Sequence, residues 1–234
     1  MHKVLQVIAG VSVLFFLFAT PVSAGSIHQD VPADLDPNAR FLIYLHGTWP
    51  ETSPVSEPHP RHGLFEYEDI LEALADEDFV VISELRRNRT DPRSYARTRV
   101  VAQVAALVAG GVPAQQITVA GFSKGGFMSL LVSAMANEPG LNLVNMAGCG
   151  ERQFRRIYET VLAEVAAHMK GRMLSLYDKR DPVAGTCAEA KAQASGLVFE
   201  EEELSIGAGH GSFYSPHSQW VDRVSAWAKS APAS

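Results

Sequence analysis

The chain has 234 residues, of which 47% are apolar and 20% charged, a composition that can bury the core of one globular domain. Lysine and arginine number 20 and aspartate and glutamate 26, which gives a net charge of −6 at pH 7. This acidic balance argues against general nucleic-acid binding.

The first 24 residues have the organisation of a secretory signal peptide. Lys3 precedes the apolar run 4–19, and Pro21 leads to a small-residue cleavage site at residues 22–24. An uncleaved membrane anchor is the alternative, because the run is nearly long enough to span a bilayer. Pro21 and the small residues favour cleavage. We therefore expect a secreted or periplasmic protein, residues 25–234, that forms a single domain without a membrane attachment.

Apolar and amphipathic segments alternate along the remaining chain. Residues 25–40, which are rich in proline and aspartate, are predicted to form an ordered arm or loop. Strands are predicted at residues 41–45, 79–83, 117–120, 141–147, 172–177 and 197–204. Helices are predicted at residues 64–76, 92–109, 126–137, 154–170 and 188–194, and from Ser215 onward. This alternation predicts an α/β fold, with a doubly wound, mainly parallel sheet of about six strands and helices on both faces.

Two loops stand out by length or charge. Residues 47–63 contain four prolines and no periodicity, and a loop of that length in a compact domain is usually functional. Arg86, Arg87 and Arg89 form a basic loop near the predicted carboxyl edge of the sheet. Together with Lys124 they could favour an anionic substrate. The interpretation that we prefer is a solvated basic loop balanced by acidic surface such as residues 200–203.

The most informative motif is Gly121-Phe122-Ser123-Lys124-Gly125, a G-x-S-x-G between a predicted strand and a predicted helix. In that setting the turn exposes the serine hydroxyl at the carboxyl edge of the sheet. The Lys124 N–H, at the start of the helix, could bind a developing oxyanion. A glycine-lined turn whose serine only caps the helix is the alternative.

With this motif in place, the chain resembles the α/β-hydrolase family from about Arg40 onward. The resemblance implies the order nucleophile, acid, histidine, each just past a strand. Ser123, Asp181 and His210 follow that order, and the family's Asp-Pro-Val pattern corresponds to residues 181–183. Asp178 is the alternative acid. Either aspartate could instead make a loop Asx-turn.

The family also has a His-Gly loop that supplies a second oxyanion donor. His46-Gly47-Thr48 corresponds to it, so the resemblance assigns the donors to the Thr48 and Lys124 N–H groups. His59 and His62 could be mistaken for a metal pair, but no third ligand stands at a suitable spacing. We therefore expect no metal and no cofactor.

The family's topology places the strands at 141–147 and 172–177 side by side. It therefore brings Cys149 and Cys187, the two cysteines of the chain, beyond neighbouring strand ends. In an oxidising compartment this predicts a disulfide. Two buried free thiols are the alternative.

These features together predict an exported serine hydrolase, of the carboxylesterase kind, acting on a small-molecule ester through an acyl-enzyme on Ser123. A peptidase or depolymerase with the same triad is the nearest alternative. A non-catalytic hydrolase-fold binding protein is the alternative from a different class. The natural substrate, its chain length and the oligomeric state are not predicted.

Overall fold

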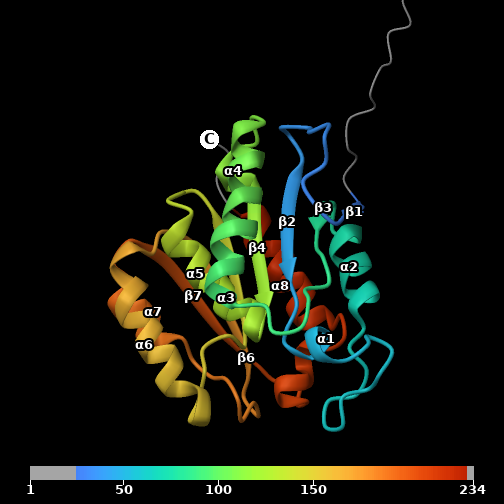
Figure 1. Ribbon diagram of the computed structural model, residues 1–234, viewed down its shortest axis with the longest axis vertical. Coiled ribbons are helices and arrows are strands. Elements are labelled where there is room, and N and C mark those ends of the chain that lie inside the picture. The colour runs from blue at the N-terminus through green and yellow to red at the C-terminus, as the bar shows by residue number, and fades with distance from the viewer. Residues whose placement is uncertain (1–24, 231–234) are drawn as a thin grey trace, which may run out of the picture.

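The computed structural model describes residues 25–230 of the chain (Figure 1). Within that range seven strands form one parallel sheet in the order β1-β3-β2-β4-β5-β6-β7. The proposed signal peptide, residues 1–24, lies outside the described residues. The strands are β1 (Ser26–His28), β2 (Arg40–Leu45), β3 (Phe79–Ile82), β4 (Ile117–Phe122), β5 (Asn142–Met146), β6 (Gly171–Asp178) and β7 (Leu197–Leu204).

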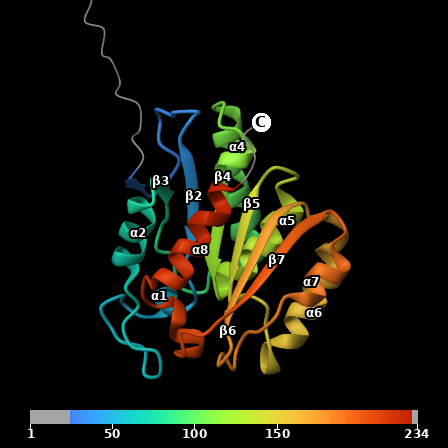
Figure 2. The same cartoon turned by 180° about the vertical axis from the view of Figure 1, so that it is seen from behind.

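Helices connect the strands and cover both faces of the sheet (Figures 1 and 2). They are α1 (Trp49–Thr52), α2 (Tyr67–Asp76), α3 (Pro92–Tyr95), α4 (Val101–Ala109), α5 (Lys124–Met135), α6 (Arg155–Val165), α7 (Ala188–Gln193) and α8 (Ser218–Lys229). A π-helical turn, Ala96–Val100, joins α3 to α4. Short 3-10 turns occur at Ala114–Gln116, Arg152–Phe154, Ala166–His168 and Gly209–Phe213. No helix within residues 25–230 is long and apolar enough to cross a membrane.

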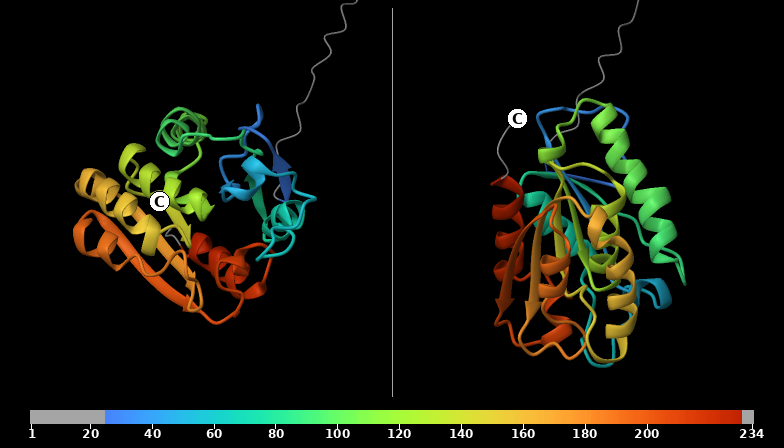
Figure 3. Two further views of the ribbon diagram at one scale, coloured as in Figure 1. Left: turned by 60° about the horizontal axis from the view of Figure 1, so that its bottom comes forward. Right: turned by 90° about the vertical axis from the view of Figure 1, so that its left-hand side faces the viewer.

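The central strands are buried on both faces, which explains their unbroken apolar sequences. Along β2, Phe41, Ile43 and Leu45 point into a core shared with α4, α5 and α6. Leu42 and Tyr44 point into the opposite core, beneath α2 and α8. Figure 3 shows the sheet between α8 on one side and α3 and α4 on the other. The doubly wound architecture predicted from the alternating segments is confirmed.

The sheet has one strand more than the sequence predicted. Ser26–His28 pairs with β3 as a parallel edge strand, although residues 25–40 were predicted to be an arm or loop. The segment is three residues long and only partly buried, so it has no hydrophobic pattern of its own. Its conformation comes from tertiary pairing with β3, which composition alone does not reveal.

Other boundaries also differ from the sequence-based predictions. The helix predicted at residues 154–170, for example, ends at Val165. The long loop 47–63 begins with the short helix α1. The final helix begins at Ser218 and not at Ser215. Instead, the Ser215 carbonyl accepts a hydrogen bond of 2.9 Å from the Trp220 indole, which fastens the incoming chain to the first turn of α8.

The strand order reverses direction at β2 and β4. The chain passes from β2 outward to β3 and then returns across β2 to β4. The connections that follow β2 and β4 therefore diverge to opposite sides, and the carboxyl ends of these two strands flank a topological switch point. In parallel α/β sheets this is where ligands usually bind. Thr48 follows β2 and Ser123 follows β4, so both lie at this edge.

Candidate active site

Ser123 occupies a strained turn between β4 and α5. Its φ of +55° and ψ of −114° are unusual for a residue with a side chain. The flanking glycines are required by close packing. A Cβ on Gly121 would lie 2.1 Å from the Gly125 carbonyl oxygen, and one on Gly125 would lie 1.9 Å from the Leu45 carbonyl oxygen. The turn therefore presents the Ser123 hydroxyl beyond the strand ends instead of burying it as a helix cap.

His210 lies in the 3-10 turn after β7 and contacts Ser123. Its Nε2 accepts a hydrogen bond from the Ser123 hydroxyl at 2.9 Å, and its Nδ1–H donates to Asp181 Oδ2 at 2.7 Å. The carboxylate acceptor at Nδ1 sets this tautomer. The His210 side chain is 10% exposed, so it is shielded yet within reach of the serine. The structure thus brings together Ser123, His210 and Asp181, which the sequence separates by up to 87 positions.

The two candidate aspartates, Asp178 at the end of β6 and Asp181 just after it, occupy different places. The Asp181 side chain is fully buried, and its Oδ1 accepts hydrogen bonds from the Val183 and Ala184 N–H groups at 2.7 and 3.1 Å. Asp178 does not contact the imidazole. Its carboxylate accepts from the Arg180 and Gly207 N–H groups and from the Ser212 hydroxyl. Burial raises the pKa of Asp178, but these hydrogen bonds outweigh burial and leave the pKa below its ordinary value.

The His46-Gly47-Thr48 loop lies directly beside Ser123. A Cβ on Gly47 would come within 3.3 Å of the Ser123 Cβ and 3.0 Å of the Phe122 ring. His46 is fully buried, and burial followed by the charge of Arg86 lowers its pKa to about 3. Its Nδ1–H donates to the Gly47 carbonyl at 2.7 Å, and its Nε2 accepts from the Arg86 N–H at 2.9 Å. His46 is therefore a neutral structural group that shapes this loop.

The prediction of a solvated basic loop is wrong for Arg86, whereas Arg87 and Arg89 are exposed as predicted. Arg86 is only 4% exposed, and its Nε donates to Glu51 Oε1 at 2.9 Å. The other carboxylate oxygen of Glu51 accepts from Lys124 Nζ at 2.6 Å. The acidic stretch on β7 pairs elsewhere, because Arg223 binds Glu200 and Glu202. Nothing in the local sequence marks Glu51 as the partner, since it lies 35 positions before Arg86.

His59 and His62 lie over the candidate triad. Their rings stack with centroids 4.4 Å apart, and the His62 ring is 5.9 Å from that of His210. Burial and the neighbouring histidines lower the pKa of His62 to about 4, so the ring is neutral at pH 7. Among residues 25–230 no group of three or more histidine, cysteine, aspartate or glutamate side chains could hold a metal ion. The packing of His62 against His210 was not predicted from the sequence.

A cavity of about 310 Å³ opens beside Ser123. Most of its wall is apolar, and Thr48 and Lys124, the two predicted oxyanion donors, also line it. Two wall residues are exposed at its rim, Phe154 at 43% and Ile157 at 61%. The complete lining is Thr48, Pro92, Ser123, Lys124, Phe127, Ala147, Gly148, Gly150, Phe154, Ile157, Tyr158, Val183 and Ala184.

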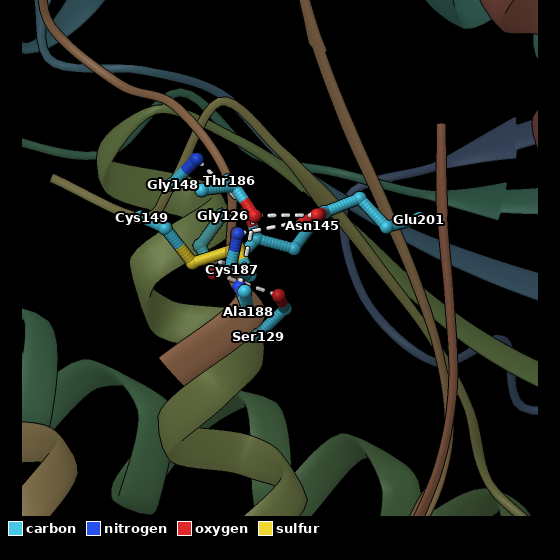
Figure 4. Close-up of a disulfide and its surroundings, with 9 residues drawn as sticks. All are labelled: Gly126, Ser129, Asn145, Gly148, Cys149, Thr186, Cys187, Ala188 and Glu201. Atoms are coloured by element: carbon cyan, nitrogen blue, oxygen red, sulfur yellow. Dashed lines mark hydrogen bonds between the residues drawn. A yellow bond between two sulfur atoms is a disulfide. The ribbon is translucent and has the colours of Figure 1, made fainter. Parts of the chain in front are cut away.

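Cys149 and Cys187 form a disulfide (Figure 4). Cys149 lies between Gly148 and Gly150, which line the cavity. The Cα atoms of the two cysteines are 5.4 Å apart and both cysteines are 1% exposed. The Cys187 N–H donates to Glu201 on β7 at 2.6 Å. The bridge fastens the end of β5 to the segment that follows Asp181. It therefore joins two parts of the cavity wall, one at Gly148 and Gly150 and the other at Val183 and Ala184.

Comparisons with known proteins identify the fold. No family model and no curated protein matches the chain by sequence. An esterase/lipase from an uncultured bacterium shares 15% identity, with a TM-score of 0.54 over 82% of this chain and 76% of that one. A truncated carbohydrate esterase from gut microbiota shares 12% identity, with a TM-score of 0.53 over 85% and 89%. Dipeptidyl peptidase 4 of Porphyromonas gingivalis shares 16% identity, with a TM-score of 0.54 over 86% of this chain but only 33% of that one. The chain has the α/β-hydrolase fold.

Proposed function

We propose that this protein is a serine hydrolase that cleaves carboxylic esters through an acyl-enzyme. The observation that carries the proposal is the continuous hydrogen-bond chain from the Ser123 hydroxyl through the His210 imidazole to the Asp181 carboxylate, at 2.9 and 2.7 Å. A serine hydroxyl needs an adjacent base to act as a nucleophile at neutral pH, and the base needs an orienting group. The chain supplies all three in contact.

In the proposed reaction, Ser123 Oγ attacks the ester carbonyl carbon while His210 Nε2 takes the hydroxyl proton. The Asp181 carboxylate stabilises the resulting imidazolium at Nδ1. The N–H groups of Thr48 and Lys124 stabilise the oxyanion of the tetrahedral intermediate. His210 then gives its proton to the departing alkoxide, which leaves as an alcohol. A water molecule, deprotonated by His210, releases the acid and restores the Ser123 hydroxyl.

The cavity supports a small ester with an apolar group as the substrate class. Its volume of about 310 Å³ lies at the low end of ligand sites, which span roughly 300–1,000 Å³. Phe127, Val183 and Ala184 provide an apolar wall close to Ser123. In the described chain, β5 leads to α6 through a short turn and not through an inserted domain, which leaves the rim open.

Export is part of the proposal. It rests on the signal-peptide pattern of residues 1–24, and the Cys149–Cys187 disulfide is consistent with an oxidising compartment. Cleavage after Ala24 would leave the whole described domain intact.

Hydrolysis of p-nitrophenyl acetate and butyrate by the purified mature protein tests the function. We expect turnover by the wild-type protein and by Ser218→Ala, a matched control on the exposed start of α8. Ser123→Ala should lose on the order of 10⁶-fold in kcat. A well-folded wild-type protein without esterase activity would refute the ester proposal. Turnover of peptide p-nitroanilides alone would favour the peptidase alternative.

A further inference from the structure

The Gly47–Thr48 peptide unit is held by its carbonyl oxygen. That oxygen accepts hydrogen bonds from His46 Nδ1 at 2.7 Å and from Arg86 Nη2 at 3.3 Å. The same peptide unit carries the Thr48 N–H, one of the two proposed oxyanion donors. A peptide unit is planar and trans, so its C=O and N–H point in opposite directions. Fixing the direction of the Gly47 carbonyl therefore fixes the direction of the Thr48 N–H.

Arg86 reaches this carbonyl from a buried position. Its Nη2 also donates to the His46 carbonyl, so a single guanidinium nitrogen contacts two successive carbonyls. Its own N–H donates to His46 Nε2, which leaves the proton of that imidazole on Nδ1, where it binds the Gly47 carbonyl. Arg86 thus acts on the peptide in two ways, directly through the guanidinium and indirectly through the His46 tautomer.

Glu51 orients the guanidinium. Its carboxylate, with a side chain 1% exposed, accepts from Arg86 Nε at 2.9 Å and from Lys124 Nζ at 2.6 Å. The Glu51 N–H also donates to the Thr48 carbonyl at 3.0 Å. Glu51 therefore binds both proposed oxyanion donor residues: its N–H binds the Thr48 carbonyl, and its carboxylate binds the Lys124 ammonium. Arg86 and Lys124 are cations and Glu51 is an anion, so the three side chains carry a net formal charge of +1. They lie beside Thr48 and Lys124, whose N–H groups are the proposed donors to the oxyanion.

Stability alone does not account for this arrangement. A buried ion pair is costly to desolvate, and replacing it by apolar groups is often neutral or stabilising. A function in the reaction explains it better, because preorganised donors near a developing oxyanion are among the largest contributions to catalysis. A charged donor at the carbonyl also polarises the peptide and strengthens its N–H as a donor.

We propose that Arg86, oriented by Glu51, is a positioning residue that directs and polarises the Thr48 N–H toward the oxyanion of the Ser123 adduct. The inference rests on the proposed serine-hydrolase function and extends it to two residues that do not touch the triad. It predicts a defect in the chemical step, since the oxyanion forms there, and not in the binding of the ground-state ester.

Arg86→Lys tests this assignment. Lysine retains the positive charge, but its single ammonium group cannot replace the planar guanidinium, which donates to Glu51 and to two backbone carbonyls at once. We expect kcat for p-nitrophenyl acetate, per titrated active site, to fall on the order of 10²-fold, comparable to the loss of one oxyanion donor. KM should stay within about threefold, as expected when an interaction made only in the transition state is lost. Glu51→Gln, which retains an acceptor for Arg86, should lose less than Arg86→Lys. The pH dependence of kcat/KM should be unchanged in both variants, because His210 and Asp181 are untouched.

Arg99→Lys is the matched control, since Arg99 pairs with Asp30 and Glu84 and not with residues of the His46-Gly47-Thr48 loop. It should retain wild-type kcat. A wild-type kcat for Arg86→Lys, or a loss that appears only in KM or in the fraction of titratable sites, would overturn the inference.

A second measurement separates this inference from the function itself. The ¹⁵N order parameter of the Thr48 amide, measured on the free protein, does not depend on any activity. We expect it to fall in Arg86→Lys and to stay unchanged in Arg99→Lys. An unchanged Thr48 order parameter in Arg86→Lys contradicts the positioning role even if the protein is an esterase. An inactive wild-type protein with the expected loss of order contradicts only the proposed function.

Discussion

Asp178 and Asp181 lie three residues apart at the end of β6, and each holds a different part of the His210 loop. Asp181 accepts a hydrogen bond from the His210 imidazole itself. Asp178 accepts from Gly207 before the histidine and from Ser212 after it. One carboxylate orients the proposed base, and the other fixes the backbone that carries it.

This division predicts different defects for the two isosteric variants. Asp181→Asn should lower kcat on the order of 10³- to 10⁴-fold with little change in thermal midpoint, because an amide favours the wrong imidazole tautomer. Active-site-titrated kinetics and thermal unfolding measure the two effects separately.

Asp178→Asn should mainly lower stability, by about 1–3 kcal/mol, because an amide nitrogen facing the Gly207 N–H and the Ser212 hydroxyl leaves donors without an acceptor. Its kcat per titrated site should remain well above that of Asp181→Asn. The reverse ranking of the two kcat values would make Asp178 the orienting acid.

The sequence allowed most of this site to be predicted because each proposed catalytic residue lies in the segment that follows a strand. Parallel strand ends meet at one edge, so the G-x-S-x-G motif and the family's chain order together pointed to Ser123, to an aspartate after the strand at 172–177 and to His210. The choice between Asp178 and Asp181 depended on the family pattern. Edge strand β1 was missed because three residues, of which the one apolar side chain, Ile27, is exposed, carry no periodic signal.

The partners of Arg86 could not be predicted for a different reason. Arg86 looked like part of an exposed basic loop because the residues around it, Arg87 and Arg89, are charged too. Its burial depends on Glu51, which lies in a proline-rich loop without periodicity. Charge composition indicates solvent exposure on average, and it cannot reveal an ion pair between distant loops. His62 was likewise missed because its contact with His210 spans most of the chain.

The buried histidines predict a loss of stability in mild acid. The pKa of His46 is about 3 in the folded protein, because of burial and then the charge of Arg86, against about 6.5 when unfolded. Between these values the unfolded chain binds more protons, so stability falls as the pH drops below about 6.5. Burial lowers the pKa of His62 in the same direction, with a smaller effect because that ring is partly exposed.

Urea unfolding at pH 7 and pH 5 measures this effect in a range where most carboxylates stay ionised. We expect the free energy of unfolding to fall by about 2 kcal/mol from His46 alone. A free energy that stays constant or rises toward pH 5 would show that His46 is not held neutral.

The disulfide predicts a stability defect on reduction. It closes a loop with a sequence separation of 38. In the chain-entropy account such a loop contributes about 4 kcal/mol, and mutational losses of native disulfides fall in a similar range. Cys149→Ser combined with Cys187→Ser should therefore lower the free energy of unfolding by about 2–4 kcal/mol. Equal stability of the double variant and the oxidised protein in urea would contradict this.

The cavity wall predicts how acyl selectivity can be changed. Val183 is partly exposed on the wall, so Val183→Phe can extend into the cavity without overpacking the core. Relative to the wild-type protein, kcat/KM should fall about tenfold more for p-nitrophenyl hexanoate than for the acetate, which is on the scale of one methylene in an apolar pocket.

Val198→Phe, an exposed change on β7, is the control for that selectivity and should leave the ratio unchanged. If Val183→Phe does not alter the ratio, the acyl group does not occupy this cavity.

The most direct test of the central claim is covalent trapping of the nucleophile. After incubation with a fluorophosphonate, intact-protein mass spectrometry should show a single adduct, and peptide mapping should place it on Ser123. His210→Gln should slow its formation strongly, because Ser123 would lose its base, and Ser123→Ala should abolish it. An adduct at another residue, or equal labelling of Ser123→Ala, would contradict the assignment of Ser123 as the nucleophile.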